Sequence, residues 1–200
     1  GYAAPDYLPA TYVPTVLTID KDVEQIHMCF TFKAPKRDSK HRYSLAVLNT
    51  LFGGGMSSRL FQKIREEEGL VYTIYSYTSA YSDTGIMTVY ACSSPQKAEN
   101  VINSVFKEIK RLKTEKIEDK LIEVTKEQII SNYIISSEST ASRLSSNGGG
   151  MILSGKVLPM EEILEKMELV DYDAVKEAID EIFIADNLSF SAVGNINNID

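Results

Sequence analysis

The sequence contains few of the residues from which most metal and redox sites are built. Its 200 residues include only two cysteines, Cys29 and Cys92, which form no Cys-x-x-Cys pair. This usage indicates neither a disulfide scaffold nor a zinc-thiolate site. Both cysteines fall in alternating strand patterns, where a free thiol behaves as a small apolar side chain. The sequence therefore fits a reducing compartment, and we expect a cytoplasmic location.

Histidine is equally scarce, and its two positions do not form a zinc motif. His27 falls in an expected strand and His41 near an expected helix start, fourteen residues apart. A zinc peptidase needs two histidines and a glutamate close together on a helix, so that both imidazoles reach one metal. No Gly-x-Ser-x-Gly context surrounds the serines, and neither glycine triplet continues into a phosphate-binding pattern. The chain by itself therefore predicts no metal site, no hydrolase triad and no phosphate loop.

Long apolar runs and basic stripes are also missing. No stretch of 18 apolar residues occurs, which argues against a membrane span. The net charge is −7, from 28 acidic and 21 basic residues, and the basic residues are scattered among acidic ones. Electrostatic capture of nucleic acid is therefore not expected, whereas a cationic peptide would suit the surface. An apolar fraction of 44% is ordinary for a globular domain.

The apolar pattern divides the chain into strands with period two and helices with period three to four. Asp38 is expected to cap a helix, and each of the glycine triplets 53–55 and 148–150 is expected to end or break one. The expected strands are Val13–Ile19, Gln25–Lys33, Val71–Ser79, Ile86–Ser93 and Leu188–Val193. The expected helices are Asp38–Phe52, Ser57–Glu68, Pro95–Leu112, Ile117–Asn147, Met160–Met167 and Tyr172–Phe183.

This order of elements predicts an α+β fold, in which a mostly antiparallel sheet carries its helices on one face. Residues 1–12 are expected to form an extended arm or interdomain linker, because prolines there disfavour both helix and central strand. Residues 13–200 are expected to form a single domain, since a chain of this length can bury one sizeable core.

The segment from Ser57 to Tyr72 is the most informative part of the sequence. Ser57 or Ser58 can cap a helix that Gly69 ends, and a strand follows at once. Arg65 then lies in the last turns of the helix and Tyr72 near the start of the strand. On spacing alone, the arginine fits an ordinary interaction with the helix dipole and the tyrosine fits ordinary strand packing.

A longer pattern around this segment resembles the second domain of insulinase (pitrilysin) family zinc peptidases, including bacterial proteins similar to mitochondrial processing peptidase. It runs from Leu48 to Tyr75, through residues 53–61 and 65–72, and extends to Tyr81–Gly85 and Tyr90-Ala91. The helical remainder to Gly194 is similar in layout. The resemblance implies the same α+β fold and the C-terminal half of a longer peptidase.

The resemblance also implies specific roles. Arg65 and Tyr72 match an arginine and a tyrosine, seven residues apart, that this domain contributes to catalysis and substrate binding. The zinc would be held by the His-x-x-Glu-His motif of an N-terminal half or partner subunit, so the chain alone is expected to hold no metal and to be inactive. Peptide substrate and that zinc-binding half are the expected partners, with neither nucleic acid nor membrane involved.

Two other functions remain open from the sequence. One is a non-catalytic scaffold or peptide-binding subunit with the same fold. The other is an autonomous module whose exposed sheet edge adds a peptide strand.

Overall fold

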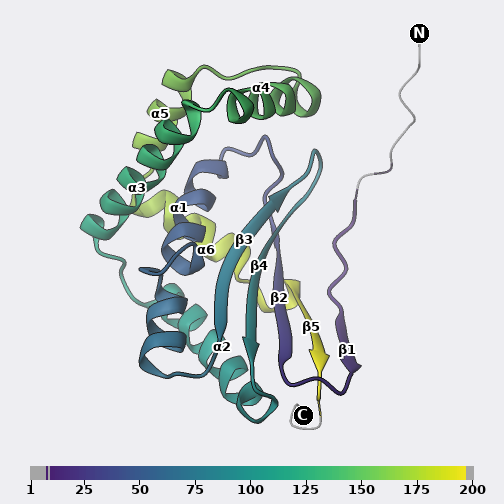
Figure 1. Cartoon of the computed structure of the whole chain (residues 1–200). Helices are drawn as coiled ribbons and strands as arrows, with labels where there is room; N and C mark the ends of the chain where they lie inside the picture. The colour runs from purple at the N-terminus through teal and green to yellow at the C-terminus, as the bar shows by residue number, and fades with distance from the viewer. Residues whose placement is uncertain (1–7, 9, 197–200) are drawn as a thin grey trace.

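A single five-stranded sheet forms the centre of the molecule (Figure 1). The computed structural model describes residue 8 and residues 10–196, so most of the arm expected over residues 1–12 lies outside the described part. The strand order is β1-β5-β2-β4-β3, with β1 parallel to β5 and the other pairs antiparallel. The strands are β1 (Val16–Asp20), β2 (Ile26–Ala34), β3 (Thr73–Ala80), β4 (Gly85–Ser93) and β5 (Leu188–Gly194).

Helices gather on one side of this sheet, which confirms the α+β prediction (Figure 1). In the part of the chain that the structure describes, no helix is both long enough and apolar enough to cross a membrane. The α-helices are α1 (Arg42–Gly53), α2 (Ala98–Thr114), α3 (Asp119–Ser137), α4 (Thr140–Ser154), α5 (Met160–Glu168) and α6 (Tyr172–Ile182). A π-helix, η1 (Phe61–Glu67), precedes β3, and 3-10 turns η2 (Pro95–Lys97) and η3 (Ala185–Asn187) precede α2 and β5.

The core lies between the sheet and α1, α2 and α6. In β2 the predicted alternation is confirmed, because Ile26, Met28 and Phe30 are fully buried. The rings of Phe32 and Phe52 both pack edge-on against Phe183, at centroid distances of 5.1 and 5.3 Å. These contacts join β2, α1 and the end of α6 into one apolar unit.

The other face of the sheet is lined by polar and aromatic side chains. Tyr75 and Tyr77 of β3 are 43% and 41% exposed, whereas their neighbours Ile74 and Ser76 point to the helices and are buried. The Tyr75 ring packs on that of Tyr90 in β4 at 5.0 Å. The alternation of side chains along the strands thus gives the sheet one buried apolar face and one solvent-exposed face.

The prediction of one long helix over Ile117–Asn147 is wrong. The chain forms two helices, α3 and α4, and the side chain of Ser139 caps the second by accepting a hydrogen bond from the Ser142 amide. Serine competes for the helix backbone in this way, so a serine-rich stretch favours a break. The glycines 148–150 lie inside α4, which instead ends at Gly155 with φ 66°.

Two expected helix caps are also wrong. Asp38 does not cap α1, because its carboxylate accepts a hydrogen bond from the Ser154 hydroxyl, 3.1 Å away. Ser58 caps no helix with its side chain and donates instead to the Gly55 carbonyl. The first glycine triplet does end α1 as expected, at Gly53.

Candidate functional site

The segment that carries the predicted site residues is a short helix followed by a strand. Leu60 and Ile64 are fully buried and hold this helix on the core. It is wound as a π-helix from Phe61 to Glu67, and at its end the Glu68 amide donates to the Lys63 carbonyl at 3.0 Å. Gly69 then adopts φ 59°, a left-handed conformation that glycine takes at low cost. The sequence prediction of a glycine-terminated helix is therefore confirmed.

Arg65 lies on the outer side of this helix. Its side chain is 43% exposed, and its guanidinium carbon is 4.8 Å from the centroid of the Phe61 ring, one turn earlier. The nearest carboxylate pairing is with Glu66, at 4.0 Å. This is a loose surface contact, which leaves the guanidinium donors available for a ligand.

Tyr72 follows the glycine turn directly before β3. Its backbone amide donates to the Cys92 carbonyl at 2.8 Å, so the residue is fixed to β4. Its side chain is 57% exposed, whereas the preceding Val71 is buried. The phenol thus projects from an anchored piece of backbone into solvent.

The structure places Arg65 and Tyr72 on the two sides of one glycine turn. Both side chains are exposed, so neither serves the apolar core. Among the described residues, no hydrogen bond or ion pair joins them directly. Their meeting around a bound ligand stays a prediction.

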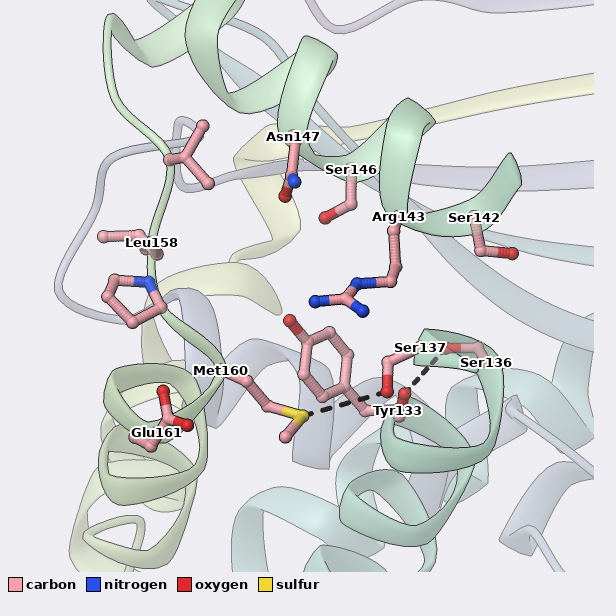
Figure 2. A pocket seen from close by; sticks show the side chains of 12 residues that line it. Tyr133, Ser136, Ser137, Ser142, Arg143, Ser146, Asn147, Leu158, Met160 and Glu161 are labelled. Carbon is pink, nitrogen blue, oxygen red and sulfur yellow. Dashed lines mark hydrogen bonds between the residues drawn. The ribbon is translucent and has the colours of Figure 1, made fainter. Parts of the chain in front are cut away.

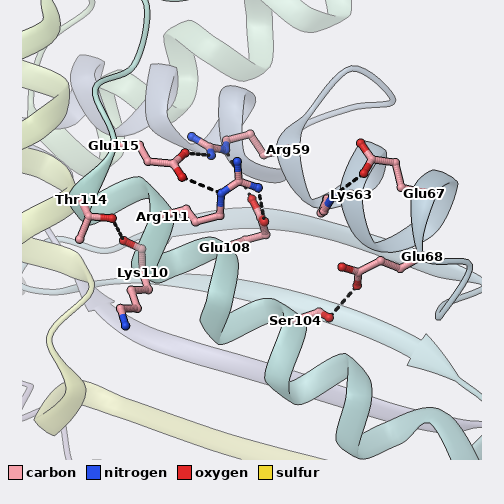
Figure 3. A network of polar contacts seen from close by, with 10 residues as sticks. All are labelled: Arg59, Lys63, Glu67, Glu68, Ser104, Glu108, Lys110, Arg111, Thr114 and Glu115. Carbon is pink, nitrogen blue, oxygen red and sulfur yellow. Dashed lines mark hydrogen bonds and ion pairs between the residues drawn. The ribbon is translucent and has the colours of Figure 1, made fainter.

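Helix α2 holds both ends of this segment, and the turn η2 before it adds one contact, features that the sequence analysis missed (Figure 3). At the C-terminal end, Lys97 donates to the Gly69 carbonyl at 2.8 Å, and the Ser104 hydroxyl donates to the Glu68 carboxylate at 2.6 Å. At the N-terminal end, Arg59 pairs with Glu108 of α2. The segment is therefore fastened to the core helix before and after Arg65.

A network of four charged residues makes the N-terminal attachment. Glu108 is 2% exposed and receives Arg59 at 3.6 Å and Arg111 at 3.0 Å. Glu115 pairs with the same two arginines, at 3.1 and 2.9 Å. The hydrogen bond from Arg111 holds the pKa of Glu115 below its usual range, and the hydrogen bonds that Arg111 donates, first to Glu115 and then to Glu108, raise the pKa of Arg111. A signal existed in the sequence, because Glu108 interrupts the apolar stripe of α2.

The solvent-exposed face of the sheet carries a second set of polar side chains, His27 and Tyr90. The Tyr90 hydroxyl lies 2.7 Å from Nδ1 of His27. Burial, followed by the adjacent Cys92, raises the pKa of Tyr90 to about 12. The phenol therefore stays protonated at neutral pH and shares a hydrogen bond with the imidazole.

Within residue 8 and residues 10–196, no three histidine, cysteine or acidic side chains are arranged so that they could hold a metal ion. His27 bonds to Tyr90, and His41 lies 3.9 Å from both Glu177 and Glu181. Zinc requires three or four converging ligands, so these residues do not fit a zinc site.

Comparisons with known sequences give consistent results. A family described as "Peptidase M16 inactive domain" matches residues 4–129. An uncharacterized zinc protease of Bacillus subtilis is 36% identical over 170 residues, which make up 85% of this chain and 42% of that protein. A second, of Rickettsia felis, is 34% identical over 195 residues, or 97% of this chain and 47% of that protein. The chain spans just under half the length of these relatives.

Solved structures share the fold. A protease from Helicobacter pylori superposes with a TM-score of 0.87 at 16% identity, covering 97% of this chain and 48% of that one. A peptidase M16 inactive domain from Pseudomonas fluorescens gives a TM-score of 0.78 at 19% identity, covering 96% and 47%. At this identity the likeness is one of fold.

Proposed function

Since the chain belongs to the peptidase M16 inactive-domain family, we propose that it is the C-terminal domain of a zinc-dependent endopeptidase. In this proposal it closes over an extended peptide and supplies Arg65 and Tyr72 to the active site. The observation that carries the proposal is the pair of exposed side chains on either side of a turn that η2 and β4 hold in place. Exposed polar groups on a rigid support are typical of binding and catalytic sites.

The proposed role of Tyr72 is electrostatic. Its hydroxyl donates a hydrogen bond to the oxyanion of the tetrahedral intermediate that forms when water adds to the scissile carbonyl. The hydrogen bond from its amide to Cys92 fixes the residue before substrate arrives, so little reorganisation is needed. Such a preformed donor lowers the barrier because the charge it stabilises develops only in the transition state.

The proposed role of Arg65 is to hold the peptide. A guanidinium offers five donors in a plane, which suits a substrate carbonyl or carboxylate. Its position over the Phe61 ring restricts the side chain without using those donors in a hydrogen bond, because a cation–π contact is made to the ring electrons. The arginine therefore contributes to ground-state binding as well as to orientation.

The metal belongs to the other half of the proposed enzyme. The relatives are described as zinc proteases and are about twice as long as this chain. Zinc held by that half, or by a partner subunit, would supply the activated water. The proposed partners of this chain are therefore that zinc-binding half and the peptide.

The free thiols of Cys29 and Cys92 are compatible with the proposed cytoplasmic location.

The test is Tyr72→Phe in the longer protein, or in the reconstituted pair of halves, loaded with zinc. We expect kcat to fall by about a hundredfold, the usual loss when one oxyanion donor is removed. Tyr81→Phe is the matched control, because Tyr81 is similarly exposed at 54% but lies at the opposite end of β3. A Tyr72→Phe protein that cleaves peptides at the parental rate would leave the scaffold function as the better description.

A further inference from the structure

Helix α4 extends past the end of the sheet, and two adjoining hollows lie along it. The first, of about 380 Å³, lies between α3, α4 and the start of α5, and Figure 2 shows Arg143, Ser146 and Asn147 directed into it. The second, of about 260 Å³, shares Ser146 and Asn147 with the first. Neither Arg65 nor Tyr72 lines either hollow.

Arg37, which lines the second hollow, carries a buried donor that has no partner. The Nε atom of Arg37 is buried and has no hydrogen-bond partner. A buried charged donor without an acceptor is costly, and most such groups in proteins are satisfied. The Arg37 backbone is fixed, since its amide donates to the Tyr81 carbonyl at 2.9 Å. Nε is closed off from water, so the Arg37 side chain has to turn toward the hollow before an acceptor there can remove this cost.

The surrounding charge favours an anionic acceptor. Arg42 and Lys156 also line the second hollow, and Arg143 lines the first. Across the described residues, none of these cations lies within 4.0 Å of a carboxylate oxygen in an ion pair. Asp38 is the acidic residue of the second hollow, and its carboxylate accepts from Ser154. In the second hollow Arg37, Arg42 and Lys156 thus face one carboxylate, whereas Arg143 of the first hollow is accompanied by Glu161. The chain as a whole has a net charge of −7.

Hydroxyl and amide groups complete the lining. Ser145, Ser146 and Asn147 come from the same turn of α4 and offer neutral donors beside the cations. Guanidinium, ammonium and hydroxyl groups together are the donors that bind planar or tetrahedral oxyanions. Asp38 and Ser154 meanwhile tie the loop before α1 to the end of α4, so both walls of the hollow are held together.

We propose that the hollow formed by Arg37, Arg42 and Lys156 beneath α4 is a binding site for a small oxyanion, either a carboxylate or a phosphate group. Arg37 turns its guanidinium toward the ligand and donates to it, and the other two cations neutralise the ligand charge. The site is separate from Arg65 and Tyr72, and its existence does not depend on their proposed role.

The test is calorimetric titration of the 200-residue chain at low, fixed ionic strength. The probes are inorganic phosphate and a short neutral peptide with a free C-terminal carboxylate, compared with its C-terminally amidated twin. Saturable binding of phosphate, or of the free acid but not the amide, supports the site and also identifies the source of the anion. Absence of saturable binding by either probe up to about 10 mM would overturn it.

Three variants make the test specific. Arg37→Gln is expected to weaken binding about tenfold or more, the factor for one lost hydrogen bond to a charged group. Lys110→Gln removes the same charge from an exposed position on α2 and should leave Kd unchanged. Asp38→Asn should instead tighten binding, because the competing carboxylate is removed.

Circular dichroism establishes that each variant is folded. If Arg37→Gln does not fold, Lys156→Gln carries the test, because Lys156 lies in the exposed connection after α4. A folded Arg37→Gln or Lys156→Gln chain with the Kd of Lys110→Gln would show that this hollow is not the site.

Discussion

Arg59 and Glu108 form an ion pair, with 3.6 Å between Nε and Oε2, in which the glutamate side chain is only 2% exposed. Arg59 precedes the helix that carries Arg65, and Glu108 belongs to the helix beneath it (Figure 3). Burying a carboxylate costs free energy unless it is paired with a cation. The two arginines that pair with Glu108 therefore explain how it can lie on the apolar face of α2. We therefore regard this pair as the N-terminal anchor of the candidate site.

Glu108→Gln is expected to destabilise the domain by about 2 kcal/mol, the range for hydrogen bonds to charged groups. Glu115 remains as a partner for both arginines, so the loss should be smaller than that for an isolated buried pair. Urea unfolding measures the change. The control is Lys107→Gln on the exposed side of α2, which should stay within about 0.5 kcal/mol of the parent. Equal stability of the two variants would contradict the anchor.

The same network gives a prediction for pH. The hydrogen bond from Arg111 lowers the folded pKa of Glu115. A depressed carboxyl pKa adds stability that is complete above the unfolded pKa and is lost as the pH falls through the folded pKa. In Arg111→Gln, the Glu115 pKa should therefore rise toward its ordinary value, as followed by NMR titration of the side-chain carboxyl. The stability difference between parent and variant should shrink in acid, and a difference independent of pH would contradict the coupling.

Periodicity accounts for much of what the sequence predicts correctly. The alternation in Ile26–Ala34 and the stripe through Val101, Val105 and Leu112 both follow from which side chains must leave water. Single-residue signals were less reliable. Asp38 and Ser58 are residue types that often cap helices. Asp38 instead accepts a hydrogen bond from the distant Ser154, and Ser58 donates one to the nearby Gly55 carbonyl.

In the candidate site, too, some features could be predicted from the sequence and others could not. The helix, its glycine end and the strand beyond it are local features, so the segment from Ser57 to Tyr72 could be predicted. Its attachment to α2 depends on contacts between residues far apart in the chain, such as Glu68 with Ser104, and side-chain spacing along the sequence carries no record of these. Glu108 is the exception, because a charge in an apolar stripe implies a buried partner.

Gly69→Ala should destabilise the domain by about 1 kcal/mol, because alanine is strained at φ 59°. Gly55→Ala is a matched control. A Cβ at either position meets nothing within 4 Å, but Gly55 lacks the positive φ, so the pair differs in backbone conformation and not in space. We expect Gly55→Ala to be neutral or slightly stabilising, measured by thermal unfolding of both variants. Equal melting temperatures would show that the turn tolerates a side chain.

In the proposed enzyme, Arg65→Ala should raise KM and also lower kcat, because the lost guanidinium both binds and orients the peptide. Phe61→Leu should raise KM more mildly, about two- to fivefold, since it removes only the cation–π contact that restrains Arg65. Lys63→Gln removes a charge from the same helix, where Lys63 pairs with Glu67, and should leave both constants near the parental values. Steady-state kinetics on the zinc-loaded protein separate the two effects. If Arg65→Ala cleaved peptides with parental constants, Arg65 would be a surface residue of the helix end and the substrate clamp would lie elsewhere.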